Sequence, residues 1–201
     1  MATIQSICVF CGSSTGRNPA HLRAAIILGE AMAAAGIRLV YGGGSIGLMG
    51  AVARTVLEAG GEVTGIIPEF LVNRERMLEG VADLVVVDDM HTRKRLMFEQ
   101  SDAFVALPGG IGTLEEVVEQ MTWAQLGRHA KPIVLANIDG FWDPLNVLLE
   151  HMAEEAFIRP GFELSYLTVS DPELIVPTIV EVAAAYTESE LEGHKDSLER
   201  M

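Results

Sequence analysis

Short apolar runs alternate with longer amphipathic stretches along the chain. The apolar, β-branched runs predict strands at Ile7–Phe10, Ile37–Tyr41, Glu62–Ile67, Leu84–Val87, Ala103–Leu107, Ile133–Ala136 and Tyr166–Val169. The stretches between them predict helices near Pro19–Ala35, Ile46–Ala59, His91–Gln100, Gly112–Leu126, Trp142–Ala156 and Asp171–Tyr186. This alternation is typical of a parallel sheet with helices on both faces. We therefore expect an α/β fold: a Rossmann-like, doubly wound parallel sheet in three αβα layers.

The residues that start and end the predicted helices are consistent with a single domain. Pro19 and Pro172 stand where proline starts a helix, and Gly36 and Gly60 follow expected helix ends. We find no internal repeat and no linker, so residues 1–187 are expected to form a single nucleotide-binding domain. Residues 188–201 are polar and lack a sustained apolar face, which predicts a disordered tail.

Composition and charge narrow the class of ligand. Hydrophobic residues make up 49% of the 201 residues, and the formal net charge is −14. An acidic protein is a poor binder of nucleic acid or of anionic membranes, because both need a basic surface. No apolar run reaches the roughly 20 residues that span a bilayer, and Met1–Gln5 does not resemble a signal peptide. We expect a cytosolic protein whose anionic ligands are held by local donors.

The two cysteines form an isolated C-x-x-C pair, Cys8 and Cys11. Cys8 lies within the first expected strand and Cys11 at its end, whereas a thioredoxin-type pair sits at a helix N-terminus. A zinc site would need two more ligands. Both thiols are therefore expected to be structural and reduced, and no metal site is expected.

Three glycine-rich loops each follow an expected strand and precede an expected helix. They are Cys11-Gly12-Ser13-Ser14-Thr15-Gly16, Gly42-Gly43-Gly44-Ser45-Ile46-Gly47 and Pro108-Gly109-Gly110-Ile111-Gly112-Thr113. Glycines in one such loop are as readily explained by a tight turn as by a ligand. Three at one sheet edge favour a phosphate-bearing ligand, because free N–H groups at helix starts attract anions. Ser13, Gly43 and Ser45 are candidate contacts.

Two nucleotide-binding motifs are disfavoured. The Gly42-x-Gly44-x-x-Gly47 spacing follows the second strand rather than the first, and the next strand ends without an acidic residue to bind a ribose. No Gly-Lys-Ser/Thr follows any of the loops, so a P-loop is absent. The sequence therefore disfavours both hydride transfer with NAD and ATP-driven chemistry.

The third loop carries the most specific candidate chemistry. Thr113 falls in the first turn of its helix, where its hydroxyl and nearby N–H groups can hold a phosphate. Glu116 lies three residues further on roughly the same helix face. Acids near a helix start commonly offset the helix dipole, and this explains Glu115 and Glu119. Beside a phosphate, Glu116 would be repulsive unless it served the reaction.

A second cluster, Arg93-Lys94-Arg95, lies early in a helix, where the dipole disfavours cations. A solvated charged face is one explanation. The other is that Arg93 points into the active site and pairs with Glu116 or with a ligand oxygen. His91 has no partner at a metal-ligand spacing, so we expect it to act as a cap or a supporting residue.

Four segments resemble the LONELY GUY family of cytokinin riboside 5′-monophosphate phosphoribohydrolases. They are Cys8–Ser14, Tyr41–Gly50, Met90–Lys94 and Leu107–Glu116, the last with the pattern P-G-G-x-G-T-x-x-E, and Thr122–Gly127 extends the match. The resemblance implies that Arg93 and Glu116 are the catalytic pair. It also implies a nucleotide site lined by Glu75, Lys94, Gly110, Ile111, Gly112, Thr113, Leu114, Glu115 and Thr122, with Gly109 in the phosphate loop.

The chain departs from the family at two places. Ile111 replaces an aromatic residue of plant members, and the stretch from Asn73 to Arg76 is only loosely similar. Family members are also labelled possible lysine decarboxylases, yet pyridoxal chemistry needs a Schiff-base lysine. Of Lys94, Lys131 and Lys195, only Lys94 is expected near the site. We expect no cofactor.

The expected function is hydrolysis of the N-glycosidic bond of a nucleoside 5′-monophosphate, which releases the base and ribose 5-phosphate. One alternative is a general AMP or purine monophosphate nucleosidase. Another is a binding protein that carries a phosphorylated ligand such as the molybdenum cofactor. A carrier needs the glycine loop but not the Arg93–Glu116 pair. The resemblance further implies a homodimer, and the helix after the third loop has more apolar residues than one buried stripe requires.

Overall fold

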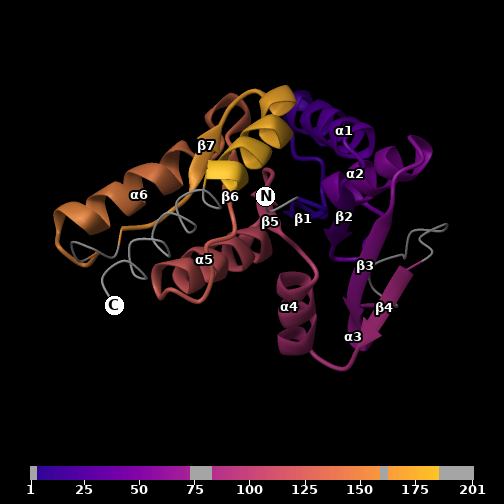
Figure 1. Ribbon diagram of the computed structural model, residues 1–201, viewed down its shortest axis with the longest axis horizontal. Coiled ribbons are helices and arrows are strands. Elements are labelled where there is room, and N and C mark those ends of the chain that lie inside the picture. The colour runs from indigo at the N-terminus through magenta and orange to yellow at the C-terminus, as the bar shows by residue number, and fades with distance from the viewer. Residues whose placement is uncertain (1–3, 73–82, 159–162, 186–201) are drawn as a thin grey trace, which may run out of the picture.

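The computed structural model describes residues 4–72, 83–158 and 163–185 and contains a seven-stranded, all-parallel sheet (Figure 1). The strand order is β4-β3-β2-β1-β5-β6-β7. The strands are β1 (Ser6–Phe10), β2 (Arg38–Tyr41), β3 (Val63–Pro68), β4 (Asp83–Val87), β5 (Ala103–Ala106), β6 (Ile133–Ala136) and β7 (Leu167–Val169). All seven predicted strands are confirmed, with ends that differ by one residue or by none from the prediction.

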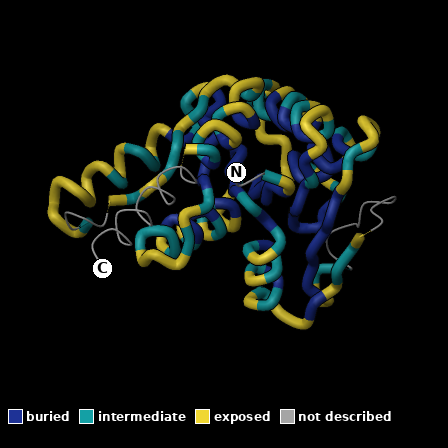
Figure 2. Tube along the Cα trace, in the orientation of Figure 1, coloured by how far each residue is buried: buried dark blue, intermediate teal, exposed yellow. Residues whose placement is uncertain are grey.

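The sheet core explains why the central strands are uninterrupted apolar runs. Every residue of β1 is buried, because β1 pairs with β2 on one side and β5 on the other and is covered on both faces. Along β1, Ile7 and Val9 face one hydrophobic cluster, whereas Cys8 and Phe10 face the other. Figure 2 shows the buried strands at the centre of the molecule.

Helices cover both faces of the sheet, which confirms the three-layer αβα prediction. Residues of α1 (Pro19–Ala34) and α2 (Gly47–Glu58) pack in the first hydrophobic cluster, together with the helix at residues 175–185. Residues of α4 (Met90–Glu99) and α5 (Ile111–Gln125) pack in the second cluster. The chain therefore crosses from one face to the other between β3 and β5, and the loops after β1 and β5 become neighbours.

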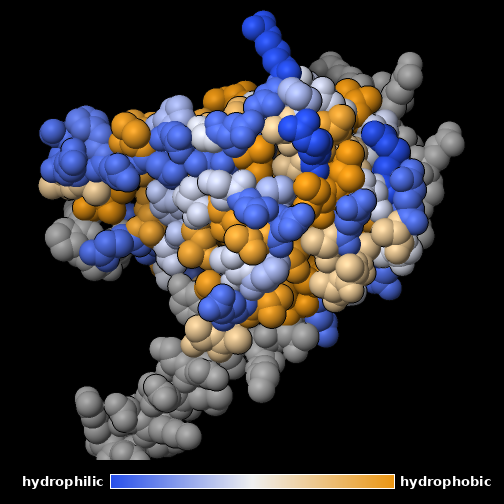
Figure 3. All heavy atoms as spheres, turned by 90° about the horizontal axis from the view of Figure 1, so that it is seen from above, coloured by the Kyte–Doolittle hydropathy of each residue, from blue (hydrophilic) through white to orange (hydrophobic). Residues whose placement is uncertain are grey.

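The remaining helical segments lie mostly at the surface. Helix α6 (Asp143–Glu154) contains no buried residue and projects to one side in Figure 1. A short 3-10 segment, η1 (Ile138–Gly140), connects β6 to it. Figure 3, which looks onto the molecule from above, shows hydrophilic and hydrophobic side chains interspersed on that face.

Two predictions about helices need correction. The sequence pattern did not indicate α3 (Glu69–Val72), a single turn without a buried residue, because so short a segment has no apolar periodicity. The last helix was predicted as one element from Asp171, but it opens with a 3-10 turn, η2 (Pro172–Leu174), before residues 175–185. The predicted tail, residues 188–201, lies outside the described residues.

Both cysteines are free and buried, as predicted for structural thiols. Burial raises the pKa of the Cys8 thiol well above its ordinary value, and the nearby Glu116 carboxylate raises it further. Burial likewise raises the pKa of Cys11. Neither thiol is activated as a nucleophile, because activation requires a lowered pKa.

Candidate active site

The three glycine-rich loops meet at the carboxyl edge of the sheet and are joined by their main chains. The Gly12 N–H donates to the Pro108 carbonyl (3.1 Å), and the Leu48 N–H donates to the Gly12 carbonyl (3.0 Å). Gly47 has a φ of 62°, and a Cβ there would collide with the main chain at Ser13. The first loop is therefore held between the second and the third, as the shared sheet edge predicted.

A hollow of about 390 Å³ lies between the first and third loops. Gly12 to Gly16 and Pro108 to Gly110 form its walls, and Arg17, His21 and Phe141 complete its rim. A second hollow, of about 470 Å³, lies on the other side of Gly109 and Gly110. Its lining is mainly apolar and comes from α5 and α6. The third loop is thus the wall between the two hollows.

Helix α5 begins on this wall with its donors uncapped. Gly110 is its N-cap and provides no side-chain hydrogen bond. Thr113 is only 3% exposed, and its hydroxyl points at Gly109, where a Cβ would collide with it. Within the described residues that hydroxyl forms no hydrogen bond. Free N–H groups and a buried hydroxyl at a helix N-terminus make a site suited to an anion.

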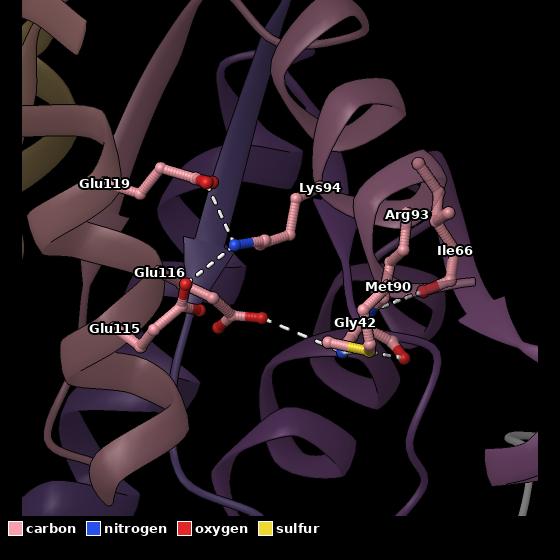
Figure 4. A network of polar contacts seen from close by, with 8 residues as sticks. All are labelled: Gly42, Ile66, Met90, Arg93, Lys94, Glu115, Glu116 and Glu119. Carbon is pink, nitrogen blue, oxygen red and sulfur yellow. Dashed lines mark hydrogen bonds and ion pairs between the residues drawn. The ribbon is translucent and has the colours of Figure 1, made fainter.

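Arg93 is positioned on α4 by main-chain carbonyls of β3 and of the second glycine-rich loop (Figure 4). Its Nε donates to the Ile66 carbonyl (3.1 Å) and its Nη2 to the Gly42 carbonyl (3.4 Å). A Cβ at Gly42 would collide with Nη2, so glycine is required for this approach. Asp89 caps α4 by accepting from the Thr92 N–H (2.8 Å), and these hydrogen bonds lower the pKa of the Asp89 carboxyl.

Glu116 faces Arg93 from α5 across the space between the two helices (Figure 4). The Arg93 Nη1 and Glu116 Oε1 atoms are 3.8 Å apart, and the two side chains are 8% and 13% exposed. This distance is an ion pair but too long for a direct hydrogen bond. The structure therefore brings together the acid and the cation that the sequence singled out, and leaves donors of Arg93 available towards Glu116.

Lys94 binds acids of α5 on two successive turns. Its Nζ contacts Glu115 Oε1 at 2.6 Å and Glu119 Oε1 at 2.9 Å. Partial burial lowers the pKa of Lys94, but the hydrogen bonds to Glu115 and Glu119 outweigh it and raise the pKa overall. The explanation of Glu115 and Glu119 as dipole-offsetting acids was therefore incomplete, because both connect α5 to α4.

The other predicted site residues are spread over a wider area. Ser13 lines the first hollow, whereas Ile111 and Leu114 line the second, and Gly112 lies in the first turn of α5. Gly43 (φ 83°) and Ser45 belong to the second loop and line neither hollow. The Thr122 hydroxyl donates to the Val118 carbonyl within α5. Glu75 lies outside the described residues.

Sequence reasoning missed Arg17 and His21. Both lie at the start of the first long helix, in a polar segment that reads as an ordinary loop and helix start. Only their spacing of four residues, which places them near each other at a helix N-terminus, could have signalled a shared role. The structure shows that they share the hollow with the third loop.

Comparison with known families supports the resemblance noted from the motifs. A family model described as possible lysine decarboxylase matches residues 49–179. A cytokinin riboside 5′-monophosphate phosphoribohydrolase of Arabidopsis thaliana is 52% identical over 180 residues, which cover 90% of this chain and 84% of the relative. A probable phosphoribohydrolase of the same kind from Oryza sativa subsp. japonica is 47% identical, over 87% of this chain and 72% of the relative.

Solved structures share the fold at low sequence identity. The molybdenum cofactor carrier protein of Chlamydomonas reinhardtii superposes with a TM-score of 0.67 at 22% identity, over 90% of this chain and 99% of that one. The DNA processing protein A of Helicobacter pylori, described with a single-stranded DNA binding mode, has a TM-score of 0.60 at 16% identity, over 89% and 81%. Such different names on one fold show that function must be inferred from the site.

The description as possible lysine decarboxylase has no support in the described lysines. Lys94 is paired with two carboxylates that raise its pKa and keep it protonated. Lys131 donates to the Phe98 carbonyl (2.7 Å) and lies over the Phe98 ring. A Schiff-base lysine must instead present a free amine to its ligand. Lys195 lies outside the described residues.

Proposed function

This chain belongs to the family, described as possible lysine decarboxylases, that includes the cytokinin riboside 5′-monophosphate phosphoribohydrolases, and we propose that it hydrolyses the N-glycosidic bond of a nucleoside 5′-monophosphate. The reaction consumes water and releases the free base and ribose 5-phosphate. The observation that carries this proposal is the buried Arg93–Glu116 pair, whose carboxylate stands on α5, the helix with the uncapped N-terminus, and whose guanidinium comes from α4.

The 5′-phosphate binds at the third loop. The N–H groups that open α5 and the buried Thr113 hydroxyl are its donors, and the missing Cβ at Gly109 leaves space for the hydroxyl. In a protein with a net charge of −14, such local donors must overcome the overall repulsion of a dianion. Binding energy from the phosphate then holds the ribose in place for the reaction.

Glu116 acts at the anomeric carbon. Positive charge builds on the ribose as the base departs, and a nearby carboxylate stabilises that charge. The same carboxylate orients the attacking water and accepts its proton. Glu116 lies one helical turn beyond Thr113, which is a suitable separation for a group that serves the ribose of a ligand whose phosphate is at Thr113.

Arg93 keeps this carboxylate ionised and in position. A guanidinium close to an acid favours its charged form. Two of its nitrogens are committed to the Ile66 and Gly42 carbonyls, so the group approaches Glu116 in one fixed orientation. The 3.8 Å separation from Glu116 leaves Arg93 able to donate to a ligand oxygen or to the departing base as well.

A turnover assay tests this function directly. The full-length protein is incubated with AMP and with its N6-isopentenyl counterpart, and free base is measured by chromatography. We expect base release from at least one of the two, and Glu116→Gln is expected to lower kcat by about 10³-fold with unchanged folding. Tight binding of the nucleotides without any release of base would support the carrier alternative and contradict the proposal.

The base preference is the second part of the proposal. The named relatives act on cytokinin nucleotides, and we propose the same substrate class for this chain. A general AMP or purine monophosphate nucleosidase is the alternative. A kcat/KM that is higher for the isopentenyl nucleotide than for AMP would support the cytokinin reading, and equal or lower values would support the alternative.

We also propose that the protein is a homodimer and acts in the cytoplasm. Apolar side chains remain exposed on α5 and at its end, with Ile111 82% and Leu126 71% exposed. Helix α6 beside them has no buried residue. Free Cys8 and Cys11 are consistent with a reducing compartment. Within the described residues, no helix is long and apolar enough to cross a membrane.

A further inference from the structure

We propose that Arg17 and His21 form a second wall of the 5′-phosphate site, opposite the third glycine loop. This inference rests on the proposed function and adds two residues that the family motifs do not include. Both side chains line the hollow of about 390 Å³ whose other wall is Pro108, Gly109 and Gly110. A phosphate at the start of α5 would then be enclosed between helix donors on one side and cationic or donor side chains on the other.

The charges of the molecule make this placement informative. The chain has 14 Lys and Arg residues against 28 Asp and Glu, so an anionic ligand must be held by local basic groups. Lys94 and Arg95 are occupied by ion pairs with glutamates. Within the described residues, the side chains of Arg17 and His21 make no hydrogen bond and no ion pair. Two unpaired basic groups at one hollow of an acidic protein favour an anionic occupant.

The buried Thr113 hydroxyl is the independent sign that the hollow is built for a ligand. Thr113 is only 3% exposed. Its hydroxyl is directed at Gly109, which lines the hollow. A hydroxyl that forms no hydrogen bond within the described residues remains available to donate to a ligand oxygen. Arg17 and His21 line the same hollow as Gly109, and basic side chains there favour an anion as the ligand group.

The rim that carries the two residues is fixed in place. Asn18 caps α1 by accepting from the Ala20 N–H (2.9 Å), and its Nδ2 donates to Asp139 Oδ2 (2.7 Å). This second bond connects the first loop to η1, next to Phe141. The His21 ring packs edge-on against the Phe141 ring, with centroids 5.4 Å apart.

Gly16 leaves room for the imidazole of His21. It has a φ of 69°, and a Cβ there would lie 3.2 Å from His21 Nδ1. The contact with Phe141 and the close approach of Gly16 restrict the orientation of the ring before a ligand binds. Such preorganisation increases affinity because less side-chain freedom is lost on binding.

The experiment measures phosphate binding separately from turnover. Inorganic phosphate is titrated into the full-length protein at low ionic strength by calorimetry, for Arg17→Gln, His21→Gln and the double variant. Arg23→Gln, on the next turn of α1, and His151→Gln, exposed on α6, are the matched controls for charge and residue type. We expect the phosphate Kd to rise about tenfold for Arg17→Gln, several-fold for His21→Gln, and less than twofold for the controls.

Kinetics provide the second measurement. With a nucleoside monophosphate, the double variant is expected to have a KM at least tenfold higher and a kcat within about twofold of the original protein. Because Arg17 is exposed, its effect is expected to shrink as salt is added. A purely structural role would lower the melting temperature without a preference for phosphate-bearing ligands.

Three possible results distinguish failure of this inference from failure of the proposed function. If the double variant binds phosphate within twofold of the original protein, the inference is wrong, whatever the turnover. If phosphate binding depends on Arg17 and His21 but no nucleotide is hydrolysed, the inference stands and the proposed function fails. If the original protein does not bind phosphate at millimolar concentration, the proposal of a phosphate site is wrong, and the first and third glycine-rich loops serve only as turns.

Discussion

At Gly42 and Gly109, a Cβ atom would collide with the Arg93 guanidinium and with the Thr113 hydroxyl, respectively. The two glycines that matter most to the proposed mechanism therefore act through the space they leave rather than through ligand contacts. Glycine-rich motifs are usually read as cradles for phosphate. Here Gly42 is equally a requirement for placing Arg93, the arginine of the proposed catalytic pair.

Arg93→Ala is expected to weaken both activity and stability. The side chain is 7% exposed and donates to two main-chain carbonyls, which would be left without a partner inside the protein. Losing such hydrogen bonds costs about 1–3 kcal/mol, or a melting temperature lower by roughly 3–10 °C. Calorimetric melting measures this. Glu116→Gln is the comparison, and an equal melting temperature for both variants would contradict the structural role of Arg93.

Thr113→Val is expected to reduce kcat/KM for a nucleoside monophosphate by about 10- to 100-fold, because it removes one charge-assisted hydrogen bond without changing the side-chain volume. The nucleoside, without its phosphate, should be a very poor substrate and should hardly respond. Thr55→Val, whose hydroxyl donates to the Ala51 carbonyl within α2, is the matched control. An equal loss for nucleoside and nucleotide would show that the third loop is only a turn.

Helices α4 and α5 carry one residue each of the proposed catalytic pair, and long side chains bridge the space between them. Lys94 reaches from α4 to Glu115 and Glu119, next to the Arg93–Glu116 pair (Figure 4). Lys94 and Glu115 were both predicted to line the nucleotide site. Their mutual contact supports an additional role, in which they set the separation of the two helices.

Lys94→Met is therefore expected to lower kcat by about tenfold, equivalent to about 1.4 kcal/mol of transition-state stabilisation. KM should change less than kcat, because the ion pairs act on helix separation rather than on the substrate. Lys94→Arg should recover most of the activity. The kinetic constants of the three proteins check this, and a rise in KM alone would support direct substrate contact instead.

A histidine in the segment between α5 and β6, His129, makes hydrogen bonds that require its neutral form. His129 Nδ1 accepts from the Lys131 N–H (3.1 Å), and Nε2 lies 3.2 Å from the Gln120 carbonyl, to which it donates. Partial burial lowers the pKa of His129, and the Lys131 and Arg128 cations lower it further. A protonated ring could no longer accept a hydrogen bond from the Lys131 N–H. Low pH therefore weakens this hydrogen-bonded link in the segment between α5 and β6.

The sign of the resulting pH dependence follows from linkage. Because the folded pKa of His129 is below its ordinary value of about 6.5, the unfolded chain binds the proton more readily. The contribution of His129 to stability is complete above about pH 6.5 and is lost as pH falls towards the folded pKa. Melting at pH 7.5 and 5.5 should show a smaller difference for His129→Asn than for the original protein, with exposed His151→Asn as the control.

At the scale of the whole molecule, fold and site differ in how far the sequence predicts them. All seven strands and the three loops follow from local patterns of apolar residues and glycine, and the shared sheet edge follows from parallel topology. Arg93 and Glu116 stood out because they defy the local dipole preference. Arg17 and His21 did not, because only tertiary structure brings the start of α1 to the loop after β5.

The exposed apolar side chains on α5 and α6 concern the whole molecule, because no described residue of the same chain covers them and a second copy could. We expect light scattering at micromolar concentration to report a dimer. Leu126→Glu, at a 71% exposed position, should weaken the dimer with little loss of monomer stability. The exposed Leu174→Glu, in η2, is the matched control. A monomer at all concentrations would contradict the proposal.

The pairing of β1 with β5 has a consequence for synthesis of the protein on the ribosome. Ser6 on β1 hydrogen bonds to Asp102 just before β5, across 96 positions of chain, and Leu107 then donates to the Phe10 carbonyl. A nascent chain that stops short of β5 has the first two glycine loops but not the wall they face. Nucleotide therefore cannot assist the early stages of folding, and it stabilises the protein only after more than half of the chain has emerged.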